Sequence, residues 1–162
     1  MSSVQTEGRA AHRVLYRIGA VLLAMGTLGH TIGGMLITGQ RGPGAGPEAD
    51  GVMARMRAVH FAWRGADSTW FDWWMGNGLG VSSLLLLAIA VLWSLGARDR
   101  RPPVAIAWAA FVSIGLLSVC GYRYFGGRIG SVFGLIALLT GIATALSRKA
   151  EATQAVAATP NP

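Results

Sequence analysis

The chain has 162 residues, enough for one domain, and 52% of them are hydrophobic, more than an ordinary soluble domain carries. Charged residues make up only 13% and lie between long apolar runs, which excludes the dispersed polar surface of a soluble globule and favours a membrane protein. The net charge of +7 does not indicate nucleic-acid binding, because the arginines flank apolar segments, so we expect anionic membrane lipids as their partners.

Four apolar segments are long enough to cross a bilayer, which takes about 20 helical residues. They cover residues 14–38, 70–95, 104–122 and 129–146. We therefore predict an all-α membrane protein, a four-helix transmembrane bundle that forms a single domain over residues 12–149. The polar ends, residues 1–11 and 150–162, are expected to be disordered.

The first span contains one ionisable residue, His30, in the run GTLGHTIGG. It follows Arg17 by thirteen residues, or ~20 Å of helix, which places it in the outer half of the membrane if the N-terminus is cytoplasmic. Ionisable groups inside a bilayer are costly and are candidates for function. Two interpretations stay open: His30 exchanges a proton with a ligand, or it forms a hydrogen bond to a neighbouring helix.

The long link between the first and second spans has two parts. QRGPGAGP cannot hold a helix and is predicted to be a loop. Apolar residues then recur at three- and four-residue spacing, which predicts a short amphipathic helix over residues 50–64 that lies at the membrane interface. Those apolar positions are Val52, Met53, Met56, Val59 and Trp63.

The second span begins with aromatic residues around a single carboxylate, in the run STWFDWWMGNG. Asp72 has two readings: an acidic residue that stabilises the N-terminus of a helix, or a general acid or base. Trp70, Trp73 and Trp74 are expected to form an aromatic belt at the outer interface. Asn77 is predicted to form a hydrogen bond to another helix.

The other two connections are short. GARDRRPP is basic and ends in a proline pair that suits a helix start, and residues 123–128 are predicted to form a tight Gly-Gly turn. The segment CGYRYFGGR, which contains this turn, places four polar residues at the outer membrane level: Tyr122, Arg123, Tyr124 and Arg128. We expect one outward-facing pocket there, roofed by a segment that carries His60, Arg64 and Asp67. Its predicted lining residues are His30, Asp72, Trp70, Trp73, Trp74, Asn77, Tyr122, Arg123 and Tyr124. The alternative is an ordinary ion-paired cap, such as Asp72 with Arg123 or Asp67 with Arg128.

Glycines recur at the four-residue spacing that lets membrane helices pack closely. Pairs occur at Gly29 and Gly33 in the first span and at Gly76 and Gly80 in the second, and a series runs into the fourth span at Gly126, Gly130 and Gly134. We expect these faces to pack within the bundle. Homo-oligomerisation through the same faces is the alternative.

The distribution of Lys and Arg gives the orientation. With both termini in the cytoplasm, eight basic residues lie inside and six outside, and the outer long link also carries three acidic residues. The sequence therefore predicts a multi-pass protein of the cell membrane with cytoplasmic N- and C-termini.

No metal site or other cofactor is predicted. The single cysteine, Cys120, excludes an intramolecular disulfide and a CxxC pair. Histidines at 12, 30 and 60 have no zinc-binding spacing, and only His30 lies in a span, which argues against a bis-histidine haem.

Residues 14–95 resemble a loosely defined family of small four-helix bacterial membrane proteins. The resemblance rests on the Gly-His-Thr triplet of GHTIGG and on TWFDWWMGNGLG, an aromatic-Asp cluster before a Gly-x-Gly-x-Gly stretch. That family carries no established activity. The layout is also faintly similar to the sterol isomerase and sigma-2 receptor group, whose pockets use carboxylates and a histidine around a lipophilic substrate. This chain departs from that group because its first span has no carboxylate.

Three functions are consistent with these features. The first is binding of a lipophilic small molecule, with acid/base isomerisation or cyclisation by a proton pair formed by His30 and Asp72. The second is a small transporter or its accessory subunit, although no acidic residue lies mid-span in the first helix. The third is a non-catalytic membrane assembly protein that uses its glycine faces to bind other membrane proteins.

Overall fold

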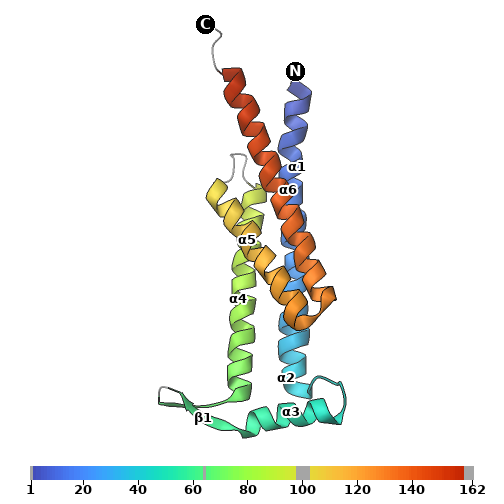
Figure 1. Cartoon of the computed structure of the whole chain (residues 1–162), viewed down its shortest axis with the longest axis vertical. Coiled ribbons are helices and arrows are strands. Elements are labelled where there is room, and N and C mark those ends of the chain that lie inside the picture. Colours follow the sequence, from blue (N-terminus) through green and yellow to red (C-terminus); the bar gives the residue numbers. More distant parts are fainter. Residues whose placement is uncertain (1, 64, 98–102, 159–162) are drawn as a thin grey trace. The chain divides into compact units, whose positions relative to one another are not determined.

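The computed structural model describes residues 2–63, 65–97 and 103–158 (Figure 1). Within these residues the chain is helical apart from one short hairpin and the connecting loops. Four helical segments are long and apolar enough to cross a membrane: Ala11–Arg41, Trp70–Ala97, Val104–Phe125 and Gly127–Lys149. The predicted fold class is confirmed, and the chain is a multi-pass membrane protein.

Two of the four spans contain a π-helical segment, in which backbone hydrogen bonds reach five residues back instead of four. In chain order the elements are α1 (Ser2–Leu28), the π-helix η1 (Gly29–Ile37), α2 (Thr38–Arg41), α3 (Pro47–Ala58), β1 (His60–Trp63), β2 (Ala66–Thr69), α4 (Trp70–Ala97), α5 (Val104–Cys120), the π-helix η2 (Gly121–Phe125) and α6 (Gly127–Ala158). The first span joins α1, η1 and α2, and the third joins α5 and η2. His30 therefore lies in a π-helix.

The first and last helices, α1 and α6, extend beyond the predicted spans. α1 begins at Ser2 and α6 ends at Ala158, whereas we expected residues 1–11 and 150–162 to be disordered. The difference has a simple physical origin. The last segment is rich in alanine, the strongest helix former, and a long helix can extend into a polar segment without a new nucleation step.

The long link follows the prediction at its start and departs from it at its end. The glycine-rich loop is confirmed over residues 42–46, with Gly42, Gly44 and Gly46 at positive φ, whereas residues 40–41 of the predicted loop belong to α2. Pro47 then occupies the first turn of α3, where its missing N–H costs nothing. The predicted helix over residues 50–64 is wrong beyond Ala58, because Val59 is extended and a strand follows.

Strands β1 and β2 form an antiparallel hairpin, with His60 opposite Thr69 and Trp63 opposite Ala66. Its first strand is rich in residues that favour strands, such as Phe61 and Trp63. The turn contains Gly65 at a φ of 86°, a conformation that L side chains rarely adopt. Arg64, expected in the roof of the pocket, lies outside the described residues, as do Arg98, Arg100 and Arg101 of the second connection.

The chain divides into two compact units, residues 24–87 and residues 1–23 with 88–162. The unit of residues 24–87 holds the long link. Its α3 runs crosswise to α4, and the hairpin leads directly into α4 (Figure 1). Arg57 of α3 donates a hydrogen bond to the carbonyl oxygen of Gly39, and its guanidinium lies 4.2 Å from the ring centroid of Phe71. α3 is thereby attached to both neighbouring spans.

The other unit contains parts of α1 and α4 and all of α5, η2 and α6. The hydroxyl of Tyr16, which is fully buried, forms a 2.9 Å hydrogen bond with Thr144 of α6. Gly121 and Gly130 let η2 and α6 approach so closely that a Cβ on Gly121 would lie 2.9 Å from the Gly130 backbone. A turn at Gly126, whose φ is 90°, joins the two. The predicted turn over residues 123–128 is wrong in its extent, because residues 123–125 belong to η2 and residues 127–128 to α6.

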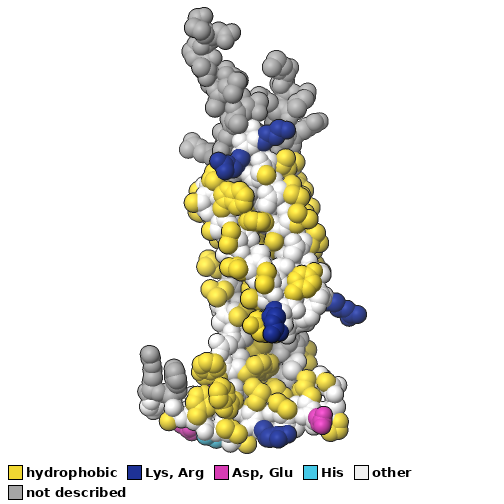
Figure 2. Space-filling view, viewed as in Figure 1, with side chains coloured by type: hydrophobic (Ala, Val, Ile, Leu, Met, Phe, Trp, Pro, Cys, Tyr) yellow, Lys and Arg dark blue, Asp and Glu magenta, His cyan; other side chains and the backbone are white. Residues whose placement is uncertain are grey.

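Hydrophobic side chains are spread along the visible face of the spans (Figure 2). Leu84, Leu86 and Leu87 of α4 are each more than 60% exposed, as are Leu116 and Val119 of α5. Such exposure would be unfavourable in water and is the normal arrangement against lipid.

Candidate functional site

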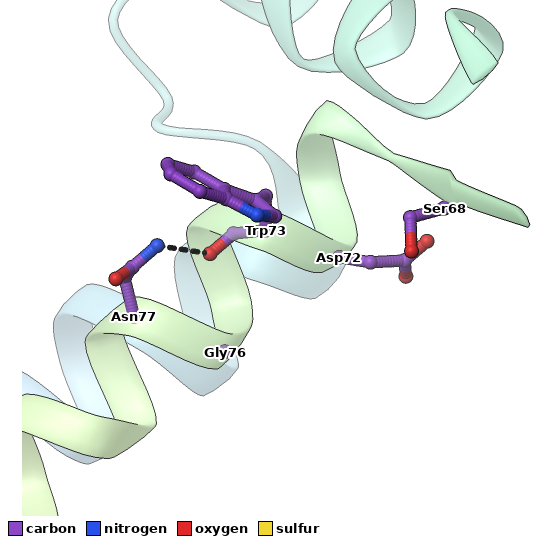
Figure 3. A pocket seen from close by; sticks show the side chains of 5 residues that line it. All are labelled: Ser68, Asp72, Trp73, Gly76 and Asn77. Atoms are coloured by element: carbon purple, nitrogen blue, oxygen red, sulfur yellow. Dashed lines mark hydrogen bonds between the residues drawn. The ribbon is translucent and has the colours of Figure 1, made fainter. Parts of the chain in front are cut away.

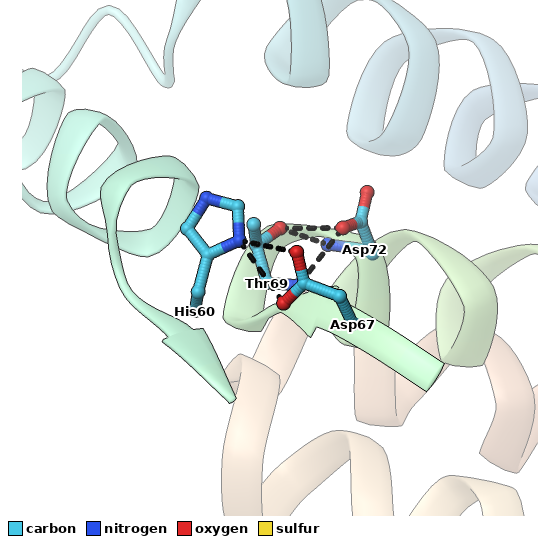
Figure 4. A network of polar contacts seen from close by, with 4 residues as sticks. All are labelled: His60, Asp67, Thr69 and Asp72. Atoms are coloured by element: carbon cyan, nitrogen blue, oxygen red, sulfur yellow. Dashed lines mark hydrogen bonds and ion pairs between the residues drawn. The ribbon is translucent and has the colours of Figure 1, made fainter. Parts of the chain in front are cut away.

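Asp72 and Thr69 form a reciprocal cap at the start of α4 (Figure 4). Oδ2 of Asp72 accepts hydrogen bonds from the Thr69 backbone N–H at 2.9 Å and from the Thr69 hydroxyl at 2.7 Å. The Asp72 backbone N–H donates in return to the Thr69 hydroxyl oxygen at 3.1 Å. This is a capping box, which satisfies N–H groups that a helix leaves unpaired at its first turn. The structural reading of Asp72 as a helix N-terminal acid is confirmed, and its side chain is exposed.

The hairpin holds a second carboxylate beside this cap (Figure 4). Nδ1 of His60 lies 3.1 and 3.2 Å from the two oxygens of Asp67, and both side chains are largely exposed. His60 and Asp67 therefore pair with each other near the first turn of α4. Phe61 of the same hairpin packs against Trp70, with ring centroids 5.0 Å apart.

The three predicted belt tryptophans lie within one turn of α4 but differ in exposure and in packing partner. Trp70 and Trp73 pack edge to face with centroids 6.1 Å apart, and each is about half exposed, at 50% and 49%. Trp74 is less exposed and packs against Phe71, whose centroid is 5.8 Å away. Trp70 and Trp73 thus present large amphipathic rings outward, the arrangement that suits a membrane interface.

A shallow, open cavity of about 300 Å³ lies on the first two turns of α4 and the strand before it (Figure 3). It is lined by Ser68, Asp72, Trp73, Gly76 and Asn77. Gly76, which we call the floor of the cavity, adds no side chain to the lining, and a Cβ there would meet no atom of its unit within 4 Å. Asn77 donates from Nδ2 to the Trp73 carbonyl oxygen at 2.8 Å, within its own helix, so the predicted hydrogen bond to another helix is wrong.

Three of the predicted site residues, Asp72, Trp73 and Asn77, are thus brought together. Trp70 supports Trp73 from the side, whereas Trp74 and His30 do not line the cavity. Ser68 and Gly76 were missed as lining residues. Thr-x-x-Asp before an apolar run is a helix-start signature that could have placed Ser68 and Thr69 at this helix end.

His30 contacts a different part of α4. Its Nε2 lies 3.2 Å from the carbonyl oxygen of Gly78, and Thr31 beside it donates to the Ser82 hydroxyl at 2.8 Å. Gly78 is six residues beyond Asp72, about 9 Å along the helix and well round its circumference. The structure therefore does not bring His30 and Asp72 together as a proton pair, and the interpretation of His30 as a hydrogen-bonding partner of a neighbouring helix is confirmed.

Tyr122, Arg123 and Tyr124 belong to the other unit. The Tyr122 hydroxyl is 2.7 Å from the Ser131 hydroxyl of α6, a hydrogen bond that joins η2 to α6. The Arg123 guanidinium lies 5.4 Å from the Tyr124 ring centroid. Their convergence with His30 and Asp72 on one pocket stays a prediction.

The glycines that allow close packing are not the predicted pairs. Gly29 and Gly33, and likewise Gly76 and Gly80, have no atom of their unit within 4 Å of the point where a Cβ would lie. Gly78 instead packs against Met35, because a Cβ there would overlap that side chain. In the other unit only part of the predicted series is used: Gly130 contacts Tyr122, and Gly134 approaches the Ser118 hydroxyl.

Among the described residues, no three or more His, Cys, Asp and Glu side chains are grouped to hold a metal ion. Comparison with known proteins gives no match to a protein-family model, to a curated protein or to a solved structure. The resemblance to small four-helix bacterial membrane proteins stays a prediction.

Proposed function

We propose that this multi-pass protein binds an amphiphilic, lipophilic molecule in the cavity at the start of α4. The observation that carries the proposal is the composition of that cavity. A carboxylate, a hydroxyl and an amide border a tryptophan ring that is half exposed, around a glycine floor. Ligand sites for lipophilic molecules combine an apolar surface with a few placed polar groups in this way.

The position of the cavity supports an amphiphile over a fully apolar ligand. Ser68 and Asp72 lie at the helix end, whereas Gly76 and Asn77 are one turn further into the apolar span. A molecule with a polar head and an apolar chain matches that gradient, since it can keep its head at the interface and its chain in lipid.

The cell membrane, with cytoplasmic termini, is the proposed location. This orientation follows the excess of Lys and Arg beside the inner helix ends. It places the hairpin, the cap and the cavity on the outer side, so the ligand would enter from the outer leaflet.

The contacts favour binding over acid/base chemistry. A general acid and base must both reach the reacting atoms. His30 instead bonds to the Gly78 carbonyl oxygen, away from the cavity, and Oδ2 of Asp72 is engaged by Thr69. We therefore propose a binding protein and do not propose the isomerase or cyclase reaction.

Native mass spectrometry of the detergent-extracted protein tests this proposal, with Gly76→Leu as the variant. A Cβ at position 76 would meet no atom of its unit within 4 Å, so a leucine there can extend into the cavity. Gly80→Leu is the matched control, because it lies one turn further along the same helix, is equally open and is outside the cavity lining. We expect wild type and Gly80→Leu to retain a bound amphiphile, and Gly76→Leu to lose it at least tenfold.

Equal retention by both leucine variants, or absence of any retained amphiphile in wild type, would contradict the proposal. An equal loss in both variants would contradict it as well, because the effect would then not depend on the cavity. Trp73→Leu is a second test variant that changes the cavity lining without changing a glycine. It should also lower the amount of amphiphile that the protein retains.

A second candidate function is assembly with another membrane protein or a second copy of the chain. The observation that favours it is the open state of Gly29 and Gly33 within their unit, since unfilled glycine faces in lipid let a further helix approach closely. Gly29→Leu with Gly33→Leu should then lower the oligomer fraction counted by single-molecule photobleaching in liposomes. If the wild-type protein itself is purely monomeric in this count, this candidate function is excluded.

A further inference from the structure

We infer that the head group recognised at this cavity is an alkylammonium cation. The inference rests on the proposed function and adds the ligand's chemical class. It is carried by the charge of the lining residues: among Ser68, Asp72, Trp73, Gly76 and Asn77, the one formal charge is the carboxylate of Asp72.

The carboxylate is available to a ligand. Both hydrogen bonds that Asp72 accepts from Thr69 end on Oδ2, so they fix the side chain and leave Oδ1 for another group. The side chain is also exposed, so a bound cation need not displace buried contacts. A carboxylate held in place in this manner attracts a cation with little loss of conformational freedom.

The aromatic wall suits the same ligand. The ring of Trp73 is 49% exposed, and its perpendicular contact with Trp70 fixes its orientation. Indole is the aromatic group that attracts cations most strongly, and quaternary ammonium ligands are commonly recognised against such rings. Asp72 and Trp73 therefore both line the cavity, with the carboxylate beside Ser68 and the indole on the side of Asn77 (Figure 3).

Two basic side chains in the described part of this unit, His60 and Arg57, are engaged by other groups. His60 pairs with Asp67, and Arg57 donates to the Gly39 carbonyl oxygen and stacks on the ring of Phe71. An anionic head group would meet the Asp72 carboxylate without a free cation among the lining residues. The expected order of affinity is alkylammonium, then an uncharged head group, then an anionic one.

The test uses three amphiphiles with the same chain: decyltrimethylammonium, decyl maltoside and decyl sulfate. Each is titrated into the full-length protein in nanodiscs, and the indole N–H resonance of Trp73, assigned with Trp73→Phe, reports binding. We expect decyltrimethylammonium to bind at least tenfold more tightly than decyl sulfate. Asp72→Asn should remove that preference, because the amide is uncharged while it keeps a similar shape.

Thr69→Ala separates charge from capping. It removes the threonine hydroxyl from the cap and retains the Asp72 carboxylate. The preference for the ammonium head group should persist in Thr69→Ala. Its loss in Thr69→Ala as well as in Asp72→Asn would show that helix capping governs binding, and would overturn the inference.

Two lipid compositions distinguish the sources of an ammonium group. Discs of phosphatidylcholine present choline head groups, whereas discs of digalactosyldiacylglycerol are uncharged and present none. Weaker apparent binding of decyltrimethylammonium in phosphatidylcholine would identify the bilayer's own head groups as competing ligands. Equal binding in both would identify a free amphiphilic amine as the ligand.

Failure of the inference is distinguishable from failure of the proposed function. If all three amphiphiles bind equally and Gly76→Leu prevents binding, the cavity is a ligand site without selectivity for cations, and only the inference is overturned. If none shifts the Trp73 resonance, or Gly76→Leu has no effect on any of them, both are overturned.

Discussion

At the scale of single residues, Asp72 shows how a side chain can have a structural and a binding role at once. Oδ2 closes the capping box with Thr69, while the carboxylate as a whole borders the cavity. A fixed carboxylate is a better cation partner than a mobile one, because its conformational entropy is already lost. The cap therefore supports the proposed site and does not compete with it.

The capping box makes a prediction about coupling. Thr69→Ala should lower the free energy of unfolding by about 1 kcal/mol, the usual cost of a lost N-cap, and Asp72→Ala should lower it as well because it breaks the other half of the capping box. The double variant should cost about as much as one single variant, because both changes break the same reciprocal bonds. Thermal unfolding in one detergent measures all three, and strictly additive losses would show that the two residues act independently.

Alanine substitution at Gly78 and at Gly80 should change the stability of the protein in opposite directions. Alanine at Gly80 enters open space within its unit and should raise stability by up to about 1 kcal/mol through helix propensity. Alanine at Gly78 overlaps the flexible end of the buried Met35 side chain, which must shift, and should lower stability by about 1 kcal/mol. The midpoints of thermal unfolding should move in opposite directions. A shift of the same sign in both would mean that Met35 does not pack on Gly78.

Polar residues were easier to locate from the sequence than their partners. His30 and Asp72 are visible as rare ionisable groups in apolar spans. Their partners, the Gly78 carbonyl and the Thr69 backbone, depend on helix register and on the first turn of α4. Glycines at four-residue spacing show that close packing is available, but the neighbouring helix decides which glycine is used.

At the scale of elements, the hairpin is the main departure from the predicted fold. The apolar pattern that predicts a helix over residues 50–64 depends on Val59 and Trp63, and the same run, VHFAW, also has the composition of a strand. Gly65 decides between the two, because its positive φ makes the turn. Helical periodicity fits a short apolar run too easily to exclude a strand.

The contact between η2 and α6 is a second element-scale feature, and it makes a sharp prediction. Alanine at Gly121 would press on the Gly130 backbone, which cannot move aside as a side chain can. We expect Gly121→Ala to destabilise the protein by about 2 kcal/mol or more. Gly115→Ala is the control, because that glycine of α5 has nothing within 4 Å and should tolerate the change. Equal melting midpoints for the two variants would argue against this close approach.

At the scale of the whole molecule, the predicted ends of the four spans lie within a few residues of the ends in the structure. The prediction worked because the bilayer imposes a length and an apolar composition on each helix, and both are readable without knowing any contact. The ends of α1 and α6 were harder to place, since a helix can continue into polar residues once it has formed. No comparable rule connects a sequence to a ligand. The cavity could therefore be located only from the contacts around α4.

The central claim is that the cavity at the start of α4 faces outward and holds an amphiphile. Thiol labelling tests it most directly, with Ser68→Cys in a Cys120→Ser background and an impermeant maleimide added to right-side-out spheroplasts. Lys149→Cys in the same background is the inner control. We predict that the cysteine at 68 reacts before lysis, more slowly when decyltrimethylammonium is present, and that the cysteine at 149 reacts only after lysis. A cysteine at 68 that stays unreactive until lysis, or reacts at a rate that the amphiphile does not change, would contradict the account.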